Sequence, residues 1–352
     1  MSTAVAEALA DHIYPLQREN NARRAHAMTF SCLGKLAATD RAILAQWRGH
    51  LEGLIRSAVD PPDPSSPPLV IGLAESGIIP SGLCHQILRE AGIPARWICS
   101  TRRPARGVAF TESHSHAPDH TLPLPAEPPS AFWFVEDEIT TGRTVRRLAR
   151  RLCEITGVRR VKIFAFADLR GPEATREFDA NLSGAGLRFS IHPLVRMREP
   201  APAGGSRPAP EPLSDRPSAP RGETDLRRWH FPRLRPALGA LADPPSIPFN
   251  GPLSGSLLVV GEAVDLGLAL VRQNPDLAFC HVTLSPWQVD GVHIHRRLDI
   301  PGGYYLYNPH TLTPPLFILA DPADSAVGRA VRQKLAEAGL SAEFLDFPEM
   351  GS

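Results

Sequence analysis

The sequence feature that most constrains this chain is an apolar run that ends in acids and leads into a small polar turn. Residues 132–135 are Phe-Trp-Phe-Val, and three acids follow at 136–138. The turn at 140–144 is Thr-Thr-Gly-Arg-Thr, and apolar residues then recur at helical spacing over 145–152. This order predicts a buried strand, an acidic strand end, a short loop and a helix N-terminus.

The turn at 140–144 has the properties of a phosphate site. Backbone N–H groups at a helix N-terminus donate to an anion, and the helix dipole adds favourable charge. A glycine lets the backbone approach closely. Acids placed just before such a loop make sense if they face ribose hydroxyls or Mg²⁺; an ordinary turn with a threonine N-cap and solvated acids is the alternative. The expected phosphate contacts are Thr140, Thr141, Gly142, Arg143 and Thr144.

Strand-like and helix-like segments alternate through two parts of the chain. Apolar strands at 69–73, 95–100 and 161–166 join the run at 132–135 and predict a parallel sheet with flanking helices. A second pattern starts at 257 and predicts a smaller, Rossmann-like α/β domain. Ligands of such sheets lie beyond the carboxyl ends of the strands.

The chain has 352 residues, 43% of them hydrophobic, which favours two domains. Between them Pro, Gly, Ala and Arg dominate and periodicity disappears. We therefore predict an N-terminal domain with an N-terminal arm at 1–198, a linker at 199–252 and a C-terminal domain at 253–352. The basic and aromatic stretch 225–235 is interpreted as a linker end packed on a domain, or as an arm reaching a phosphate or an aromatic substrate.

Charge and composition argue against several partners. Lys and Arg number 38 against 37 acids, for a net charge of +1, so bulk nucleic-acid or membrane-surface binding is not expected. No apolar run reaches the ~20 residues of a membrane span, and no signal peptide is evident. The five cysteines are widely spread without CxxC, which predicts reduced, buried thiols and a cytoplasmic location.

At 132–144 the chain resembles the type I phosphoribosyltransferases, whose signature is an apolar strand, two acids, two further residues and Thr-Thr-Gly with a later Thr. The resemblance implies that Glu136 and Asp137 hold the ribose hydroxyls of phosphoribosyl pyrophosphate (PRPP). It implies that the loop 140–144 cradles the 5′-phosphate, with Arg143 where many members have Gly. Mg²⁺ is implied as the cofactor, reaching Asp137 indirectly through Mg–PRPP.

The resemblance also implies a pyrophosphate site and a lid. A loop after the first core strand holds pyrophosphate in these enzymes, which points to Glu75, Ser76 and Gly77 here; a plain structural turn is the alternative. The long polar stretch 101–120 is expected to cover PRPP. Its expected functional residues are Arg102 and Arg103 for pyrophosphate, and Glu112, His114 and His116 for acceptor contact or general base catalysis. The His-x-His pair alone is weak support for a metal site.

Over nearly its whole length the chain resembles tellurite-resistance-associated bacterial proteins that join a phosphoribosyltransferase domain to a C-terminal TRSP domain. Matching features are the arm at 18–24, the segments 72–75 and 100–102, and the motif at 305–308. At the motif that names the second domain this chain has Thr-Leu-Ser-Pro at 283–286, with Leu284 in place of Arg. The arm, together with Gly34-Lys35, is interpreted as a solvated helix start or as a phosphate-facing segment.

The two halves share a rhythm. A strand followed by Glu75 is echoed by a strand followed by Glu262, and Val135-Glu136-Asp137 by Leu319-Ala320-Asp321. We hypothesise that the C-terminal domain is a degenerate copy of the first. Any two α/β domains share part of such a rhythm, which is the competing interpretation.

The expected function is Mg²⁺-dependent transfer of ribose 5-phosphate from PRPP to an unidentified, base-like acceptor, in the biosynthesis of a nucleoside-like metabolite. The expected partners are these small molecules, with a homodimer as a further expectation. A non-catalytic sensor of PRPP or nucleotides on the same fold is the alternative, and hydrolysis or lyase chemistry on a nucleotide is a third possibility.

Overall fold

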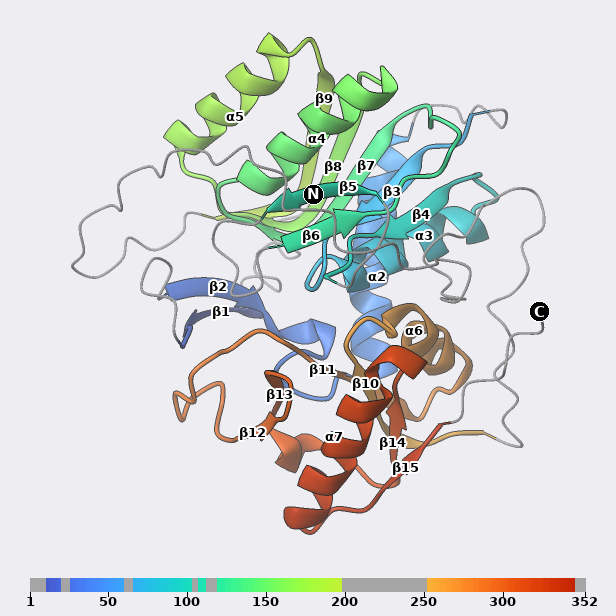
Figure 1. Cartoon of the computed structure of the whole chain (residues 1–352), viewed down its shortest axis with the longest axis vertical. Coiled ribbons are helices and arrows are strands. Elements are labelled where there is room, and N and C mark those ends of the chain that lie inside the picture. Colours follow the sequence, from blue (N-terminus) through green and yellow to red (C-terminus); the bar gives the residue numbers. More distant parts are fainter. Residues whose placement is uncertain are drawn as a thin grey trace.

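The first of the two parallel sheets lies in the upper half of the molecule (Figure 1). The computed structural model describes residues 11–19, 26–59, 66–102, 107–111, 119–197 and 252–345. All neighbours in the first sheet run parallel. Its five strands, in spatial order, are β4 (Arg96–Cys99), β3 (Leu69–Gly72), β7 (Phe132–Ile139), β8 (Arg160–Asp168) and β9 (Arg188–Arg196).

The second sheet lies in the lower half of Figure 1 and is also parallel throughout. Its four strands, in spatial order, are β11 (Leu277–Val282), β10 (Gly255–Val260), β14 (Leu316–Leu319) and β15 (Ala342–Phe344). The predicted class is confirmed: a parallel N-terminal sheet with flanking helices, and a smaller second α/β unit. The domain boundaries at 198 and 252 stay predictions, because 198–251 lies outside the described residues.

Helices and short hairpins complete both units. The helices are α2 (Arg41–Ala58), α3 (Ile78–Glu90), α4 (Arg143–Thr156), α5 (Pro172–Gly184), α6 (Val264–Gln273) and α7 (Ser325–Glu337), with 3₁₀ turns η2 (Ser31–Leu33), η5 (Pro309–Thr311) and η6 (Pro322–Asp324). Antiparallel pairs are β1 (Ile13–Gln17) with β2 (His26–Phe30), β5 (Val108–Thr111) with β6 (Asp119–Leu122), and β12 (Arg297–Ile300) with β13 (Tyr304–Tyr307).

The strands of the first sheet send alternate side chains into two apolar layers, as the period of two requires. In β7, Phe132 and Phe134 pack with α4 and α5. Trp133 and Val135 belong to the layer formed by α2 and α3. Because both faces are covered there, β7 is apolar at every position from Phe132 to Val135, which is why this run shows no alternation.

The layer under the first sheet continues into the second unit. Helices α3 and α6 pack against each other between the two sheets (Figure 1). Leu83 of α3, Leu257 of β10 and Leu268 of α6 belong to one buried cluster. The N-terminal segment joins both units as well, because Thr39 exchanges two 2.8 Å backbone hydrogen bonds with Phe279 of β11.

The elements differ from the sequence expectations in detail. Strand β7 runs on to Ile139, so Glu136 and Asp137 lie within it rather than beyond its end. Strand β9 lies at the sheet edge with mostly half-exposed side chains, a pattern that gave no apolar signal. All five cysteines are buried free thiols, as predicted. No helix in the described ranges is long and apolar enough to cross a membrane.

Candidate active site

Glu136 and Asp137 lie where β7 extends beyond the end of its neighbour β3. Strand β3 pairs with β7 only as far as Phe134, whereas β8 follows β7 to Ile139. The chain leaving β3 therefore turns over Glu136 and Asp137, whose exposed fractions are 8% and 1%. The carboxyl ends of the strands place these acids at the edge where ligands of parallel sheets bind.

The predicted pyrophosphate loop, residues 74–77, lies directly against this pair. A Cβ on Gly77 would lie 3.2 Å from Glu136 Oε2 and 2.7 Å from Leu73 N, so no larger residue fits there. The Ser76 side chain hydrogen-bonds Asp137. Two segments that the sequence separates by sixty residues thus form one site, which joins the predicted ribose acids to the predicted pyrophosphate loop.

Asp137 is held by a buried cation. Lys35, from the segment between η2 and α2, forms an ion pair with its carboxylate. Burial alone would raise the pKa of Asp137, but Lys35 and hydrogen bonds from Lys35, Ser76 and the Glu138 amide keep that pKa below its usual value. Burial likewise disfavours charged Lys35, yet Asp137, Glu138 and Glu75 raise its pKa. Both groups are therefore charged at neutral pH.

The predicted phosphate loop is open to solvent at the start of α4. Thr141 is exposed, and Thr140, Arg143 and Thr144 are partly exposed. Gly142 adopts φ 69°, and a Cβ there would lie 2.6 Å from the Phe178 ring. Only glycine combines this left-handed conformation with this contact. The N–H groups of the first helical turn have no intrahelical acceptor and can donate to an anion, although that of Arg143 already donates to Thr141 Oγ1 at 3.4 Å.

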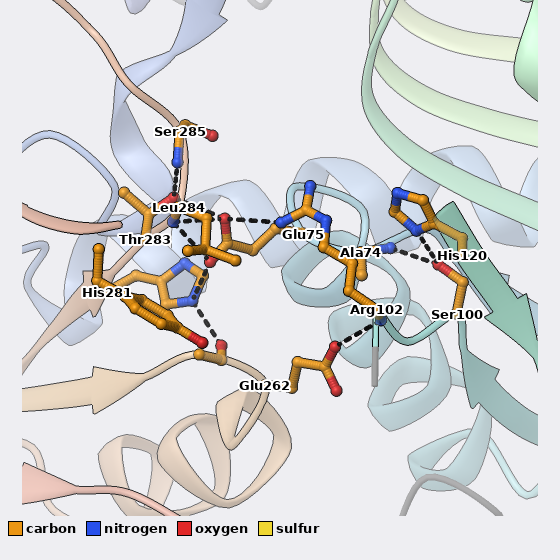
Figure 2. A network of polar contacts seen from close by, with 12 residues as sticks. Ala74, Glu75, Ser100, Arg102, His120, Glu262, His281, Thr283, Leu284 and Ser285 are labelled. Atoms are coloured by element: carbon orange, nitrogen blue, oxygen red, sulfur yellow. Dashed lines mark hydrogen bonds and ion pairs between the residues drawn. The ribbon is translucent and has the colours of Figure 1, made fainter. Parts of the chain in front are cut away.

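Glu75 reaches across to the second unit (Figure 2). Its carboxylate accepts hydrogen bonds from Thr283 Oγ1 at 2.8 Å and from Leu284 N at 2.9 Å. Arg102 Nη1 lies 3.8 Å and His281 Nε2 3.6 Å from it. Burial lowers the pKa of His281, which leaves that ring neutral. The Glu75 side chain is therefore fixed by the second unit.

The strand end after β4 is also fixed from the second unit. Glu262 accepts from Thr101 Oγ1 at 3.0 Å and from Arg102 N at 3.3 Å. Next to them, Ala74 N donates to Ser100 Oγ at 2.8 Å, which ties this strand end to the 74–77 loop. The loop, the strand end and the second unit thus form one polar network (Figure 2).

A cavity of about 190 Å³ lies in this network, between the units. Ala74, Glu75 and Arg102 line it from the first unit, and Gly261, Glu262 and Leu284 are among the residues that line it from the second. Arg102 supplies its cationic charge. The cavity includes Ala74 and Glu75 of the predicted pyrophosphate loop in its lining and is lined by both units.

Some predicted site residues lie outside the described residues, namely Arg103, Glu112, His114, His116 and the stretch 225–235. The described part of the N-terminal arm faces the second unit, since Arg18 lies over the Trp287 ring at 4.5 Å from its centroid. The contacts of Glu262, Thr283 and His281 with this site were not predicted from the sequence. The Thr-Leu-Ser-Pro motif was the one signal that pointed to Thr283.

Comparison with known proteins identifies the family. A family model for phosphoribosyl transferases matches residues 15–197, just over half of the chain. The chain belongs to the phosphoribosyltransferase family. No curated protein matches the chain.

Solved structures similar to this chain include adenine phosphoribosyltransferases. The enzyme from Rhodothermus marinus is 16% identical, with 56% of this chain and 100% of that chain covered and a TM-score of 0.37. The one from Leishmania donovani is 16% identical, with 59% and 87% covered and a TM-score of 0.40. The one from Giardia lamblia, complexed with 9-deazaadenine, is 15% identical, with 56% and 99% covered and a TM-score of 0.37.

Proposed function

We propose that the protein transfers ribose 5-phosphate from PRPP to a base-like acceptor and releases pyrophosphate, in the biosynthesis of a nucleoside-like metabolite. One observation carries the proposal. The Glu136–Asp137 pair contacts the 74–77 loop, and β7 leads on from this pair into the open loop 140–144 at the start of α4. This order suits a sugar with an anionic group at each end.

The reaction breaks the bond between the anomeric carbon and pyrophosphate oxygen, and pyrophosphate leaves with the electron pair. An acceptor nitrogen bonds to that carbon and loses its proton. Positive charge develops on the ribose ring, so preorganised carboxylates next to it favour the transition state. Glu136 and Asp137 hold the ribose hydroxyls, the loop 140–144 holds the 5′-phosphate, and the 74–77 loop with Arg102 and Arg103 holds pyrophosphate.

The acceptor side of the proposal is assigned to the lid. Glu112, His114 and His116 are proposed to contact the acceptor or to take its proton, because carboxylate and imidazole are the usual general bases. The C-terminal unit lines, with Gly261, Glu262 and Leu284, the cavity beside the proposed pyrophosphate loop.

Mg²⁺ fits these residues as an ion carried by PRPP. No cluster of three or more metal-binding side chains occurs in the described part of the chain. The Asp137 carboxylate already forms an ion pair with Lys35. Mg²⁺ typically keeps waters and substrate phosphates as ligands, so it needs few protein carboxylates. Bound with PRPP, it would neutralise the departing pyrophosphate, with Asp137 as an indirect contact.

Calorimetric titration of purified protein with PRPP and Mg²⁺ tests the donor half of this function without an acceptor. Turnover is then measured as pyrophosphate release with a panel of nitrogen heterocycles. Saturable PRPP binding and acceptor-dependent pyrophosphate release are expected. Absence of PRPP binding would overturn the proposal.

A PRPP or nucleotide sensor is the second candidate, and the Lys35–Asp137 pair favours it. The protein's own ammonium neutralises a carboxylate that the transferase needs for the ribose. Tight PRPP binding with no pyrophosphate release from any acceptor would select the sensor.

Three further proposals concern context. We keep the assignment to the tellurite-resistance-associated proteins, with a TRSP-type unit at 253–352, as a proposal beyond the family match at 15–197. A cytoplasmic location and a homodimer are likewise proposed. Light scattering of the purified protein tests the dimer.

A further inference from the structure

The first four strands of the N-terminal sheet have the same topology as the four strands of the second sheet. Each sheet places the second strand at the edge, then the first, third and fourth: β4-β3-β7-β8 in one, β11-β10-β14-β15 in the other. In each, a helix joins the first and second strands, a two-stranded hairpin precedes the third, and a helix joins the third to the fourth. The hairpin is not required of a parallel sheet, so its presence in both units is a specific likeness.

Strand pairing then matches the units residue by residue. Thr101 follows β4 and bridges to β6, and Thr283 follows β11 and bridges to β13. Cys99, two positions before Thr101, pairs with Gly72 of the first strand, and Glu75 lies three positions after Gly72. In the same way, His281, two positions before Thr283, pairs with Val259, and Glu262 lies three positions after Val259. The pairing register between the first and third strands of each sheet places Asp137 and Asp321 at equivalent positions.

The matched residues bind each other reciprocally across the interface. Thr283 Oγ1 donates to Glu75 at 2.8 Å, and Thr101 Oγ1 donates to Glu262 at 3.0 Å. The next backbone amide in each unit donates to the same glutamate, at 2.9 and 3.3 Å. The matched helices α3 and α6 also pack on each other. Reciprocal contacts of this kind define a twofold interface, here within one chain.

The second unit has kept the interface residues and lost the ligand residues. Ala320 stands where the first unit has Glu136. Asp321 is retained, but its Oδ1 accepts from the Ala323 and Asp324 amides at the start of η6. The Thr-Thr-Gly loop is absent. Selection on ligand binding alone would not leave this pattern.

The retained contacts act on the pyrophosphate end of the first site. Thr283 and Leu284 fix Glu75, which begins the segment 75–77, and Glu262 fixes Thr101 and the backbone of Arg102. We propose that the C-terminal unit is a degenerate second copy of the phosphoribosyltransferase fold, retained as a brace that holds both pyrophosphate-binding elements. Thr283 and Glu262 are then positioning residues. The proposal rests on the proposed function.

Paired calorimetric titrations of full-length Thr283→Val test the brace. One titrant is PRPP with Mg²⁺, and the other is ribose 5-phosphate, which lacks pyrophosphate. Loss of one hydrogen bond to a buried carboxylate should weaken PRPP binding about tenfold. Ribose 5-phosphate affinity should stay at the wild-type value, because the loop 140–144 and the acids are untouched. A merely structural role would weaken both ligands together.

Matched variants complete the experiment. Thr283→Ser keeps the hydroxyl and should restore PRPP affinity, and Glu262→Gln should lower it selectively even if Thr283→Val does not fold. Thr29→Val makes the same change at a buried threonine of β2 that does not line the cavity, and it should bind PRPP normally. Wild-type protein that binds neither ligand overturns the proposed function. Wild type that binds PRPP, with both interface variants unchanged or equally weakened toward both ligands, overturns the brace alone.

Discussion

Each unit has an aspartate near the carboxyl end of its third strand. Asp137 lies within β7 and Asp321 follows β14, and the two aspartates have different partners. In the first unit, α4 begins six residues after Asp137, and the intervening loop stays open. In the second, α7 begins four residues after Asp321, which caps η6 with its own carboxylate. The shorter connection occupies the amides that would otherwise bind an anion. A ligand site on this fold therefore depends on keeping a capping carboxylate away from the backbone amides that follow the third strand.

The largest expected effect comes from Lys35→Met, which removes the buried cation that pairs with Asp137. A buried carboxylate without its partner costs about 3–5 kcal/mol of unfolding free energy. Wild-type Asp137 has a lowered pKa, so its stabilisation is present above about pH 4 and is lost at lower pH. In the variant, burial raises that pKa instead.

Thermal unfolding of both proteins between pH 7 and pH 4 measures this prediction. The gap in melting temperature should be widest at pH 7 and should narrow toward pH 4, where protonation of Asp137 relieves the variant. A gap that is constant with pH would contradict the ion pair.

Next in size is the effect of changing either aspartate to asparagine. Asp137→Asn should lower pyrophosphate release by about 100–1000-fold, the usual result of losing one electrostatic contact to the transition state. Asp321→Asn should leave turnover and stability near wild type, because asparagine caps a helix as well as aspartate. Steady-state kinetics of pyrophosphate release and thermal melting curves of both variants test these predictions. A large kinetic defect in Asp321→Asn would show that the second unit retains a working site.

The smallest expected effect is the difference in stability between alanine substitutions at Gly142 and Gly157, which flank α4 and share a left-handed conformation. Gly142, at the phosphate loop, would meet Phe178, whereas Gly157 at the far end has no neighbour within 4 Å. Alanine at Gly157 should cost only the backbone strain, about 1–2 kcal/mol. Alanine at Gly142 should cost about 1 kcal/mol more and weaken ribose 5-phosphate binding. Denaturant titration and calorimetry test this; equal costs would contradict the Phe178 contact.

The local structure of the motif at 132–144 could be predicted from the sequence because its parts are contiguous, whereas its role in binding PRPP stays a proposal. Strand, acids, loop and helix N-terminus follow one another over 132–144, and each has a local signature. The length of β7 was underestimated, because Glu136 and Asp137 look like a strand end although pairing with β8 continues to Ile139.

The partners of the motif could not be predicted, because they come from distant segments. Lys35 and Asp137 are 102 positions apart, and Glu75 and Thr283 are 208 apart. No local pattern marks which buried charge meets which carboxylate. The repeat itself was visible as a rhythm, but its reciprocal contacts emerge only when both sheets are placed together.

The shared core between α3 and α6 has a consequence for synthesis on the ribosome. The first sheet is complete at Arg196, while α6 begins at Val264. Until then, the apolar side of α3 that α6 will cover faces water, and Glu75 lacks its donors from 283–284. Exposed apolar surface on a partly made chain invites aggregation. A nascent chain stopped between the units is therefore the form of this protein that most needs a chaperone.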